Sequence, residues 1–275
     1  MSTEAVAGRV PHIGVIGGSG FYRFLDDASV VEADTPYGSP SGPLAVGEVR
    51  GVPVAFLPRH GPGHRFPPHR VPSRANLWAL RALGVRQVLA PYAVGSLRAD
   101  LAPGRFVVPD QLIDRTWGRE HTYADGSDGV VHVPFADPYC PDGRRAVLAA
   151  GSLRGDDVVD GGTLVVVNGP RFSTRAESRW HAASGGDVVG MTAMPEAALA
   201  RELALCYTGI ALVTDFDAGV GEDDFVTQEE VFRVMAANVE RVRALLADVV
   251  VTLPSAPTCS CAAAVEGQRL PYALP

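Results

Sequence analysis

Short apolar runs that alternate with helical patterns are the feature that most constrains the fold of this chain. Each run is rich in valine, isoleucine and leucine and lacks the strict polar alternation of a half-exposed strand. Strands of this kind are buried on both faces, so helices must cover both sides of the sheet that they form. The expected strands lie in residues 12–18, 52–61, 85–97, 105–113, 162–172, 187–192 and 209–219. The pattern predicts an α/β fold with a mixed, largely parallel twisted sheet flanked by helices.

The segments between these runs have helical spacing. In SRANLWALRALG, residues 73–84, apolar residues recur on one helical face and the run ends in glycine. Residues 174–186 and 194–206 follow the same pattern. The longest candidate, residues 227–253, has Thr227 as its N-cap, ahead of two acidic residues that suit the positive end of a helix.

The chain is expected to form one domain. No internal repeat, low-complexity linker or shift in composition interrupts it before the tail that follows Pro254. With 275 residues, it is long enough to bury a sizeable core. We therefore expect a single α/β domain over residues 12–253, a short N-terminal extension at 1–11, and a C-terminal tail at 254–275 that carries a Cys-Ser-Cys motif.

Charge and hydropathy favour a small ligand. The net charge is −7 and no block of lysine or arginine is present, so the sequence lacks the basic patch that nucleic acids and anionic membranes attract. No apolar segment approaches the roughly 20 residues that span a bilayer, and the N-terminal MSTEAVAGRV lacks the layout of a signal peptide. We expect a cytoplasmic protein with no nucleic-acid or membrane partner.

The cysteines point to no metal and no disulfide framework. Cys140, Cys206, Cys259 and Cys261 are too few for such a framework, and their spacing is not that of a zinc motif. Two of them stand in a polar, proline-flanked tail. We expect exposed thiols without a role, and the alternative is a redox-labile pair between Cys259 and Cys261.

The stretch GVIGGSGFY, residues 14–22, is a strand that ends in glycines, where backbone N–H groups can approach an anion. A dinucleotide fingerprint fails because Arg23 stands where a third glycine or alanine is needed. A Walker loop fails because no Gly-Lys-Ser/Thr follows. What remains is a small loop whose Ser19 hydroxyl suits one modest anion, or a plain strand-to-turn junction.

Arg59 and His60 follow the next apolar strand, in LPRHG. A guanidinium fork beside an imidazole donor suits a tetrahedral oxyanion, although such pairs are also common on solvated surfaces. Together with His64 and His69, His60 also invites a metal interpretation, but no nearby carboxylate completes a ligand set. We favour anion binding and expect no metal.

Asp215 and Asp217 follow a buried strand in LVTDFDAG. Residues i and i+2 point to one face unless the strand bends, so the two carboxylates can accept from an amino group and hold a proton near a heterocycle nitrogen. Carboxylates at the start of a loop also serve simply as caps. Combined with an anion site, the pair suggests a substrate with a phosphate end and an amino-heterocycle end.

Longer blocks of the sequence resemble one enzyme family. GVIGGSGFY, LPRHGPGH and RANLWALRALGV are joined by AVGSLRADLAPGRFVVPDQLIDRT and by GPRFSTRAESRWHAASGGDVVGMTAMPEAALARELALCYTGIALVTDFDAG. Together they resemble the trimeric purine nucleoside phosphorylase superfamily, and most of all its 5′-methylthioadenosine phosphorylase branch. The resemblance covers about residues 12–253. It implies a homotrimer, a sheet that forms a distorted barrel flanked by helices, and reversible cleavage of an N-glycosidic bond by phosphate; whether trimers pair into hexamers stays open.

The resemblance assigns roles to individual residues. Those that match the phosphate site, or flank it, are Ser19, Arg59, His60, Tyr92, Ala93 and Thr192. Those at or beside nucleoside-binding positions are Phe172, Ser173, Met191, Asp215, Phe216 and Asp217. Those near the 5′ side of the sugar are His64, His132, Gln228, Val231 and Phe232. The resemblance implies no cofactor and no metal, because inorganic phosphate is the co-substrate.

Ser173 and Asp215 match positions that separate 6-aminopurine enzymes from 6-oxopurine ones, which carry Glu and Asn there. An aspartate accepts from an exocyclic amine and, when protonated, donates to N7, whereas an asparagine amide suits a carbonyl oxygen. The resemblance therefore implies adenine chemistry, with Asp215 as the general acid at N7 while phosphate attacks C1′. Such an acid typically contributes about 10²–10⁴-fold.

Three positions depart from the family. Tyr92 replaces a small hydroxyl or thiol residue, so either its phenol or its backbone would meet the phosphate. Gly190 replaces the asparagine of the methylthioadenosine enzymes and is similar to the 6-oxopurine branch. Gln228 stands where an apolar residue would line the methylthio pocket, and a buried amide there lacks a partner unless it turns to solvent.

The leading hypothesis is a pentosyltransferase that converts 5′-methylthioadenosine and phosphate to adenine and 5-methylthioribose 1-phosphate, in purine and methionine salvage. The alternatives within the family are phosphorylases of adenosine, of 6-oxopurine nucleosides such as 5′-methylthioinosine, or of another 5′-modified adenosine. A purine sensor without turnover is disfavoured because Arg59, His60 and Asp215 are retained together.

Overall fold

The computed structural model describes residues 10–126, 129–220 and 226–275, so most of the expected N-terminal extension (residues 1–9) lies outside the described residues. In this described part, eleven strands form one sheet: β1 (Ile13–Gly17), β2 (Ser29–Val31), β3 (Leu44–Val49), β4 (Val52–Pro58), β5 (Gln87–Ser96), β6 (Phe106–Val108), β7 (Gln111–Arg115), β8 (Val158–Asp160), β9 (Thr163–Val167), β10 (Val188–Gly190) and β11 (Cys206–Phe216). The helices are α1 (Ser73–Ala82), α2 (Pro141–Arg154), α3 (Arg175–Ala183), α4 (Ala193–Glu202) and α5 (Gln228–Thr252), with short 3₁₀ turns η1 (Pro62–His64), η2 (Pro68–Arg70) and η3 (Ser260–Val265).

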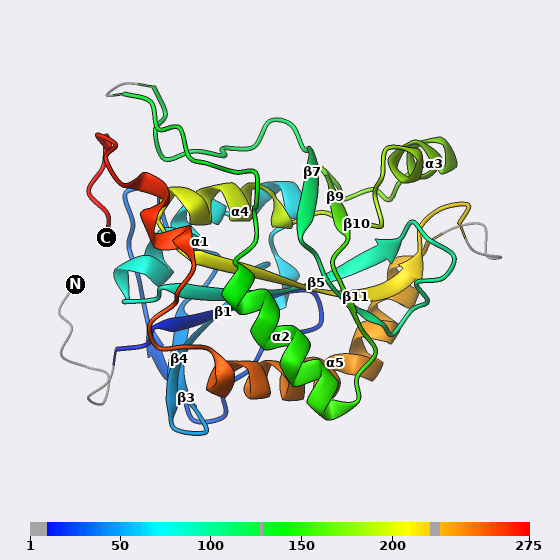
Figure 1. The fold of residues 1–275 in the computed structure, drawn as a ribbon, viewed down its shortest axis with the longest axis horizontal. Coiled ribbons are helices and arrows are strands. Elements are labelled where there is room, and N and C mark those ends of the chain that lie inside the picture. The colour runs from blue at the N-terminus through cyan, green and yellow to red at the C-terminus, as the bar shows by residue number, and fades with distance from the viewer. Residues whose placement is uncertain (1–9, 127–128, 221–225) are drawn as a thin grey trace.

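Strand β5 is the centre of the sheet, and the sheet splits beside it (Figure 1). Along one edge, β5 pairs in parallel with β11 over nearly its whole length. Along the other edge, residues 87–89 pair with β1 and residues 95–96 pair with β10. Among the described strands, none pairs with residues 90–94 on that second edge. The gap between β1 and β10 therefore leaves the middle of β5 open to the cavity described below.

The sheet is mixed and largely parallel, as predicted. Its antiparallel pairs are β2–β3, β3–β4, β5–β10 and β6–β11. One predicted strand is wrong in extent: residues 105–113 form two strands, β6 and β7, which pair with different neighbours. Pro109 and Asp110 separate them, because proline has no N–H for a ladder and the Asp110 carboxylate accepts a hydrogen bond from Gly162 N at 2.8 Å.

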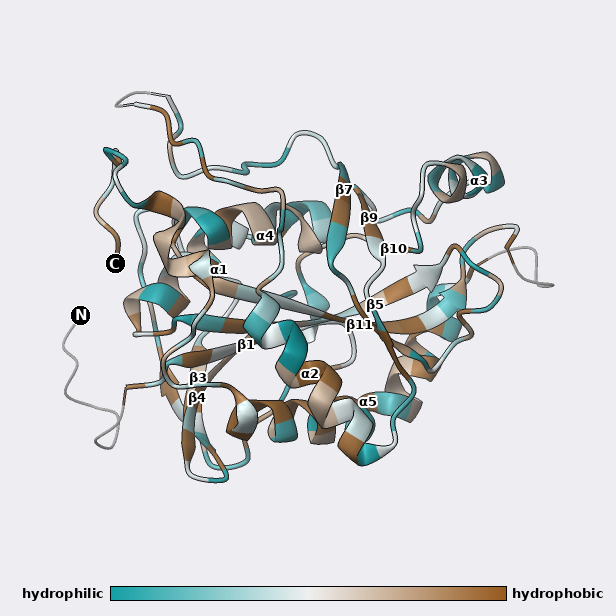
Figure 2. Ribbon diagram, viewed as in Figure 1, coloured by the Kyte–Doolittle hydropathy of each residue, from teal (hydrophilic) through white to brown (hydrophobic). Residues whose placement is uncertain are grey.

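Helices cover both faces of the sheet. Helices α1 and α4 pack on one face, in a core with Leu77 and Leu199, while α2 and α5 pack on the other, with Val147 and Leu246 (Figure 1). Helices α2 and α5 alternate hydrophobic and hydrophilic residues along their length, as amphipathic helices do (Figure 2). The single α/β domain predicted from the alternating pattern is confirmed.

The predicted helices are present and somewhat shorter. Thr227 is the N-cap of α5, since its hydroxyl accepts from Glu230 N at 3.2 Å. Helix α2 was not predicted, because glycines and arginines interrupt its apolar residues. A Cβ on Gly143, in its first turn, would lie 1.9 Å from Thr208 Oγ1, so this glycine lets α2 start directly against β11. None of the helices in the described ranges is apolar enough over a sufficient length to span a membrane.

The C-terminal tail folds back onto the domain, and this overturns the prediction of exposed thiols. Its turn η3 packs Val265 against Val131 and Ala204, and the Tyr272 hydroxyl donates to Glu202 O at 3.0 Å. As a result, Cys261 is buried with Cys140 and Cys206, and the partly exposed Cys259 lies beside them. Sequence spacing could not predict this, because the tail crosses back over the starts of α2 and β11.

Candidate active site

A cavity of about 340 Å³ opens where the sheet splits. Its walls come from residues at or just beyond the ends of β1, β4, β10 and β11, from the middle of β5, and from the first turns of α5. Ligand sites of open α/β sheets lie in this position, outside the carboxyl ends of the strands. The predicted site residues that line it are Ser19, Arg59, His60, His64, Tyr92, Ala93, Phe172, Ser173, Met191, Thr192, Asp215, Asp217, Gln228, Val231 and Phe232.

Two predicted residues are not brought to this cavity. Phe216 is the last residue of β11, directly after Asp215, and neighbouring residues of a strand point to opposite faces. His132 lies in the loop between β7 and α2, where its backbone N and O pair with the side chain of Gln268 at 3.0 and 2.9 Å. Within one chain, His132 is therefore part of the contact with the C-terminal tail.

Arg59 forms a buried ion pair that the sequence analysis missed. Its Nε and Nη2 donate to the carboxylate of Glu196 at 2.5 and 3.1 Å, and its Nη1 donates to Pro91 O at 3.0 Å. Burial acts to lower the pKa of Arg59, but the charge and hydrogen bonds of Glu196 raise it. The guanidinium is thus a fixed cation with only part of its N–H groups left for a ligand. The sequence feature that could have pointed to Glu196 is its position as the one carboxylate among the apolar residues of MPEAALA.

Tyr92 belongs to the same buried network. Its phenol donates to the hydroxyl of Tyr207 at 2.6 Å, which donates to Glu196 Oε2 at 2.8 Å. The guanidinium carbon of Arg59 lies 5.2 Å from the ring centroid of Tyr92, within cation–π range. The phenol is engaged in this network, so of the two expected roles the one through the backbone beside Ala93 does not require this hydrogen bond to break.

His60 is held as a neutral imidazole. Its Nδ1 lies 2.8 Å from Phe66 O, and a carbonyl can only accept, so Nδ1 carries the hydrogen and Nε2 is left as an acceptor. Burial lowers the pKa of His60 to about 3, the hydrogen bond to Phe66 opposes this, and the charge of Arg59 adds to the lowering. The ring nitrogen left for a ligand is thus an acceptor, whereas a donor was expected from the sequence. An acceptor beside a guanidinium suits a phosphate that still carries a P–OH group.

Asp215 is set apart from Asp217 by its surroundings. Burial raises the pKa of Asp215 to about 6, a hydrogen bond from Thr214 opposes this at 2.7 Å, and the charge of Asp217 adds to the rise. Asp217 instead accepts a hydrogen bond from Ser178 Oγ at 2.6 Å. A carboxyl whose pKa is raised by burial keeps its proton closer to neutral pH, which is the property of a general acid.

Two features of the backbone place Asp215 in the cavity. The register of β11 against β5 shifts between Val213 and Asp215, and such bulges re-aim side chains next to active sites. Opposite them, Gly95 leaves the space that the carboxylate needs: a Cβ there would lie 2.9 Å from Asp215 Oδ2. Neither the register shift nor the space at Gly95 can be predicted from the spacing of hydrophobic residues in the sequence.

Aromatic rings and the start of α5 form another part of the cavity wall, next to His60. His64 stacks on His60 with ring centroids 4.1 Å apart, and its Nδ1 lies 2.8 Å from the hydroxyl of Tyr22. Phe232 packs edge-on against His64 at 5.9 Å. Gln228, the first residue of α5, lines the cavity while remaining exposed, so it stands at the rim.

Comparisons with known proteins show the family of this chain. The phosphorylase superfamily model matches residues 12–251. Purine nucleoside phosphorylase of Streptomyces coelicolor is 60% identical, over 96% of this chain and 97% of that protein. S-methyl-5′-thioadenosine phosphorylase of Mycolicibacterium smegmatis is 55% identical, over 96% and 99%. Among solved structures, methylthioadenosine phosphorylase from Schistosoma mansoni with adenine has a TM-score of 0.83 at 41% identity, over 88% of this chain and 91% of that one. A methylthioadenosine phosphorylase from an antarctic soil metagenomic library has a TM-score of 0.88 at 40% identity, over 94% and 92%.

Proposed function

This chain belongs to the phosphorylase superfamily, and we propose that it cleaves 5′-methylthioadenosine with inorganic phosphate to give adenine and 5-methylthioribose 1-phosphate. The observation that carries this proposal is the pairing, in one cavity, of the Arg59–His60 anion site with a buried carboxyl, Asp215, whose pKa is raised to about 6. The reaction needs an anionic nucleophile and an acid for the leaving base, and this cavity offers a site for the first and supplies the second.

At the phosphate end, the chain would hold the nucleophile without a metal. Arg59 supplies a permanent charge, and the ion pair with Glu196 fixes its direction. Ser19, Thr192 and Ala93 line the same cavity and would contribute the two hydroxyls and a backbone group to the phosphate. The free Nε2 of His60 would accept from the P–OH group and orient the remaining oxygens toward C1′. Holding phosphate against the sugar in this way converts a bimolecular attack into a nearly unimolecular one.

At the base end, Asp215 would donate its proton to N7 as the C1′–N9 bond stretches. The negative charge that develops on the purine is then neutralised, and the base leaves as neutral adenine. Phe172, Ser173 and Met191 also line the cavity and would contact the nucleoside. Protonated Asp215 donates while Asp217, held by Ser178, remains an acceptor for the exocyclic amine.

A second candidate substrate is adenosine, because Gln228 stands at the rim of the cavity where a methylthio group would prefer apolar neighbours. One relative is named purine nucleoside phosphorylase, and the Schistosoma mansoni protein is also called adenosine/methylthioadenosine phosphorylase. The Gln228 amide can form a hydrogen bond with a 5′-hydroxyl, whereas it would lack a hydrogen-bond partner against a thioether. The other proposed contacts, to the phosphate and to the base, would be the same for both substrates.

Steady-state rates with 5′-methylthioadenosine, adenosine, inosine and 5′-methylthioinosine, each with and without phosphate, test the function. The adenine nucleosides should turn over only with phosphate, and 5′-methylthioadenosine should have the highest kcat/KM. Turnover without phosphate would indicate a hydrolase, and nucleoside binding without turnover would indicate a sensor. Asp215→Asn should lose most adenine-nucleoside activity and shift the preference toward 6-oxopurines; an unchanged preference would remove Asp215 from base recognition.

We also propose that the enzyme works as a homotrimer in the cytoplasm, serves methionine salvage, and needs no cofactor. Support for assembly comes from large apolar side chains on the surface, including Trp117, which is 74% exposed, and Val130, which is 68% exposed. Both lie in the loop between β7 and α2 that also carries His132. Sedimentation equilibrium would give the number of chains and show whether two trimers associate.

A further inference from the structure

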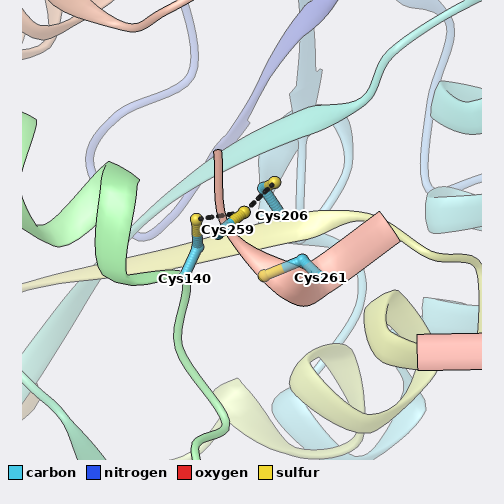
Figure 3. A group of neighbouring side chains, drawn as sticks. All are labelled: Cys140, Cys206, Cys259 and Cys261. Carbon is cyan, nitrogen blue, oxygen red and sulfur yellow. Dashed lines mark hydrogen bonds between the residues drawn. The ribbon is translucent and has the colours of Figure 1, made fainter. Parts of the chain in front are cut away.

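Four cysteine side chains meet outside the active site, at the opposite end of β11 from Asp215. Their sulfurs all lie within 4.8 Å of one another. They come from three parts of the chain: Cys140 from the start of α2, Cys206 from the start of β11, and the remaining two from the C-terminal tail (Figure 3). They include every cysteine of the sequence, so the tail brings the whole thiol content of the protein to one point.

The spacing of these sulfurs fits a single thiophilic ion. Cys259 Sγ lies 3.6 Å from Cys140 Sγ and 3.4 Å from Cys206 Sγ. In a tetrahedral zinc site with Zn–S bonds of about 2.3 Å, neighbouring sulfurs are about 3.8 Å apart. A small expansion of the cluster would therefore admit one ion at its centre. Thiolates at this spacing surround one metal rather than a cluster of several iron atoms.

Separate contacts hold Cys140 and the Cys-Ser-Cys segment of the tail in place. Cys140 is the N-cap of α2, and Gly143 N donates to its sulfur at 3.5 Å, a contact that also stabilises a thiolate. Asp142 fixes the tail: its Oδ2 accepts from Thr258 N at 2.7 Å and from Cys259 N at 3.0 Å. Asp142 is itself buried, so a dedicated anchor brings the Cys-Ser-Cys segment to α2.

The arrangement favours a metal over a disulfide. Cys259 is close to two different cysteines at once, and all four sulfurs lie within 4.8 Å of one another, so they converge on one point instead of separating into two pairs. Cys140, Cys206 and Cys261 are buried, which suits the closed, four-coordinate sites of structural zinc. Soft thiolate ligands select zinc over magnesium or calcium.

We propose that Cys140, Cys206, Cys259 and Cys261 bind one zinc-like divalent cation in a tetrahedral tetrathiolate site. The four thiols lose four protons as four metal–sulfur bonds form, with no change in oxidation state. The ion would tie the C-terminal tail to the starts of α2 and β11. This role is structural and does not depend on the proposed phosphorylase reaction, whose groups lie at the other end of β11.

Metal analysis of the full-length protein, purified under reducing conditions without a metal-affinity tag, tests the site. We expect close to one zinc per chain. Reduced apoprotein titrated with Co²⁺ alone should show the thiolate-to-cobalt charge transfer and the intense visible bands of a tetrahedral site. Zinc should raise the Tm of the apoprotein, and a chelator should reverse the rise. These readouts stand even if no phosphorylase activity is found.

The paired variants Cys259→Ser/Cys261→Ser and Ser260→Ala separate the site from general effects on the tail. The first should lose the zinc and the cobalt bands, while the second, which changes the exposed residue between the two cysteines, should keep both. If wild type neither contains zinc nor shows cobalt bands, or if the double cysteine variant retains the metal, the proposal is wrong. The proposal would also be overturned if the metal-free protein had a mass lower than that of the reduced chain by two hydrogens for each disulfide.

Discussion

Arg59 and Glu196 form a bidentate ion pair in which each side chain is only 1% exposed, although 137 residues separate them in the chain. The pair links the end of β4 to the first turn of α4 and places a permanent cation at the wall of the cavity. A buried cation costs free energy unless it is paired, so Glu196 is what allows Arg59 to stand there. Fixing the guanidinium in advance also removes the need to order it when phosphate binds.

Glu196→Gln is expected to lower both stability and phosphate use. Removing one partner of a buried ion pair leaves an uncompensated charge and typically costs about 3–5 kcal/mol. The loosened guanidinium should also lower kcat/KM for phosphate by about 10- to 100-fold, because small misplacements of a catalytic group have effects of this size. Chemical denaturation and phosphate saturation curves give the two quantities.

Glu202→Gln is the matched control, since Glu202 is buried on the same helix and accepts from Tyr123 N at 2.7 Å, away from Arg59. Its phosphate kinetics should equal those of wild type. Equal phosphate kinetics in Glu196→Gln as well would mean that Glu196 does not position the cation.

Asp215→Asn should stabilise the protein at high pH while it impairs catalysis. Because burial raises the pKa of Asp215 from 3.8 to about 6, the folded state binds this proton more tightly than the unfolded state. Stability from this group is therefore full below about pH 4 and is lost as pH rises to about 6, a total of about 3 kcal/mol. Asparagine cannot ionise and avoids the loss.

The measurement is Tm against pH for both proteins at one protein concentration. The variant should exceed wild type at pH 8, and the difference should shrink toward pH 4. A difference that stays constant over this range would show that Asp215 has no raised pKa. In wild type, kcat/KM for adenine nucleosides should also fall as pH rises above about 6, because the general acid loses its proton.

His60→Gln should weaken phosphate binding and leave nucleoside binding unchanged. The neutral imidazole is expected to accept one hydrogen bond from the phosphate, and hydrogen bonds to charged groups are worth about 1.5–3 kcal/mol. The KM for phosphate should therefore rise about 10- to 100-fold. His69→Gln, in the same loop but outside the cavity lining, should leave it unchanged. A larger effect on the nucleoside than on phosphate would place His60 at the sugar instead.

Gly95→Ala tests whether the space beside Asp215 matters. The added Cβ would lie 2.9 Å from Asp215 Oδ2 and 3.4 Å from Asp217 Cβ, so the first carboxylate must move. We expect a drop in kcat of about 100-fold, with little change in the KM for phosphate, whose proposed ligands Arg59 and His60 do not contact the added Cβ. A variant in which the phosphate KM rises and kcat is unchanged would contradict this assignment.

Long continuous features of this protein were predictable from its sequence. The buried strands β1, β5 and β11 are unbroken apolar runs. Ligands lie beyond the carboxyl ends of parallel strands, and this rule predicted that Arg59 and Asp215 belong to one site. Spacing alone could not predict that β5 borders both β1 and β10 on one edge, although this split makes the cavity.

What could not be predicted depends on contacts between distant segments. Glu196 looks like an ordinary helix residue until α4 is placed against β4. The tautomer of His60 depends on the carbonyl of Phe66 in a loop without periodicity. The burial of Cys261 depends on a tail that folds back through Asp142, so its thiol was wrongly expected to be exposed.

Gln228→Leu should shift the substrate preference toward the 5′-methylthio group. Gln228 is exposed at the rim of the cavity, near the ring of Phe232, and in the bound state its amide would face the 5′ substituent. A leucine there buries apolar surface against a thioether, and it leaves a 5′-hydroxyl without a partner, at a cost of about 1–3 kcal/mol. The ratio of kcat/KM for 5′-methylthioadenosine over that for adenosine should therefore rise about tenfold or more. Glu229→Gln, at the neighbouring exposed position of α5, should leave the ratio as it is. An unchanged ratio in Gln228→Leu would mean that the amide points to solvent in both complexes and that other residues select the 5′ substituent.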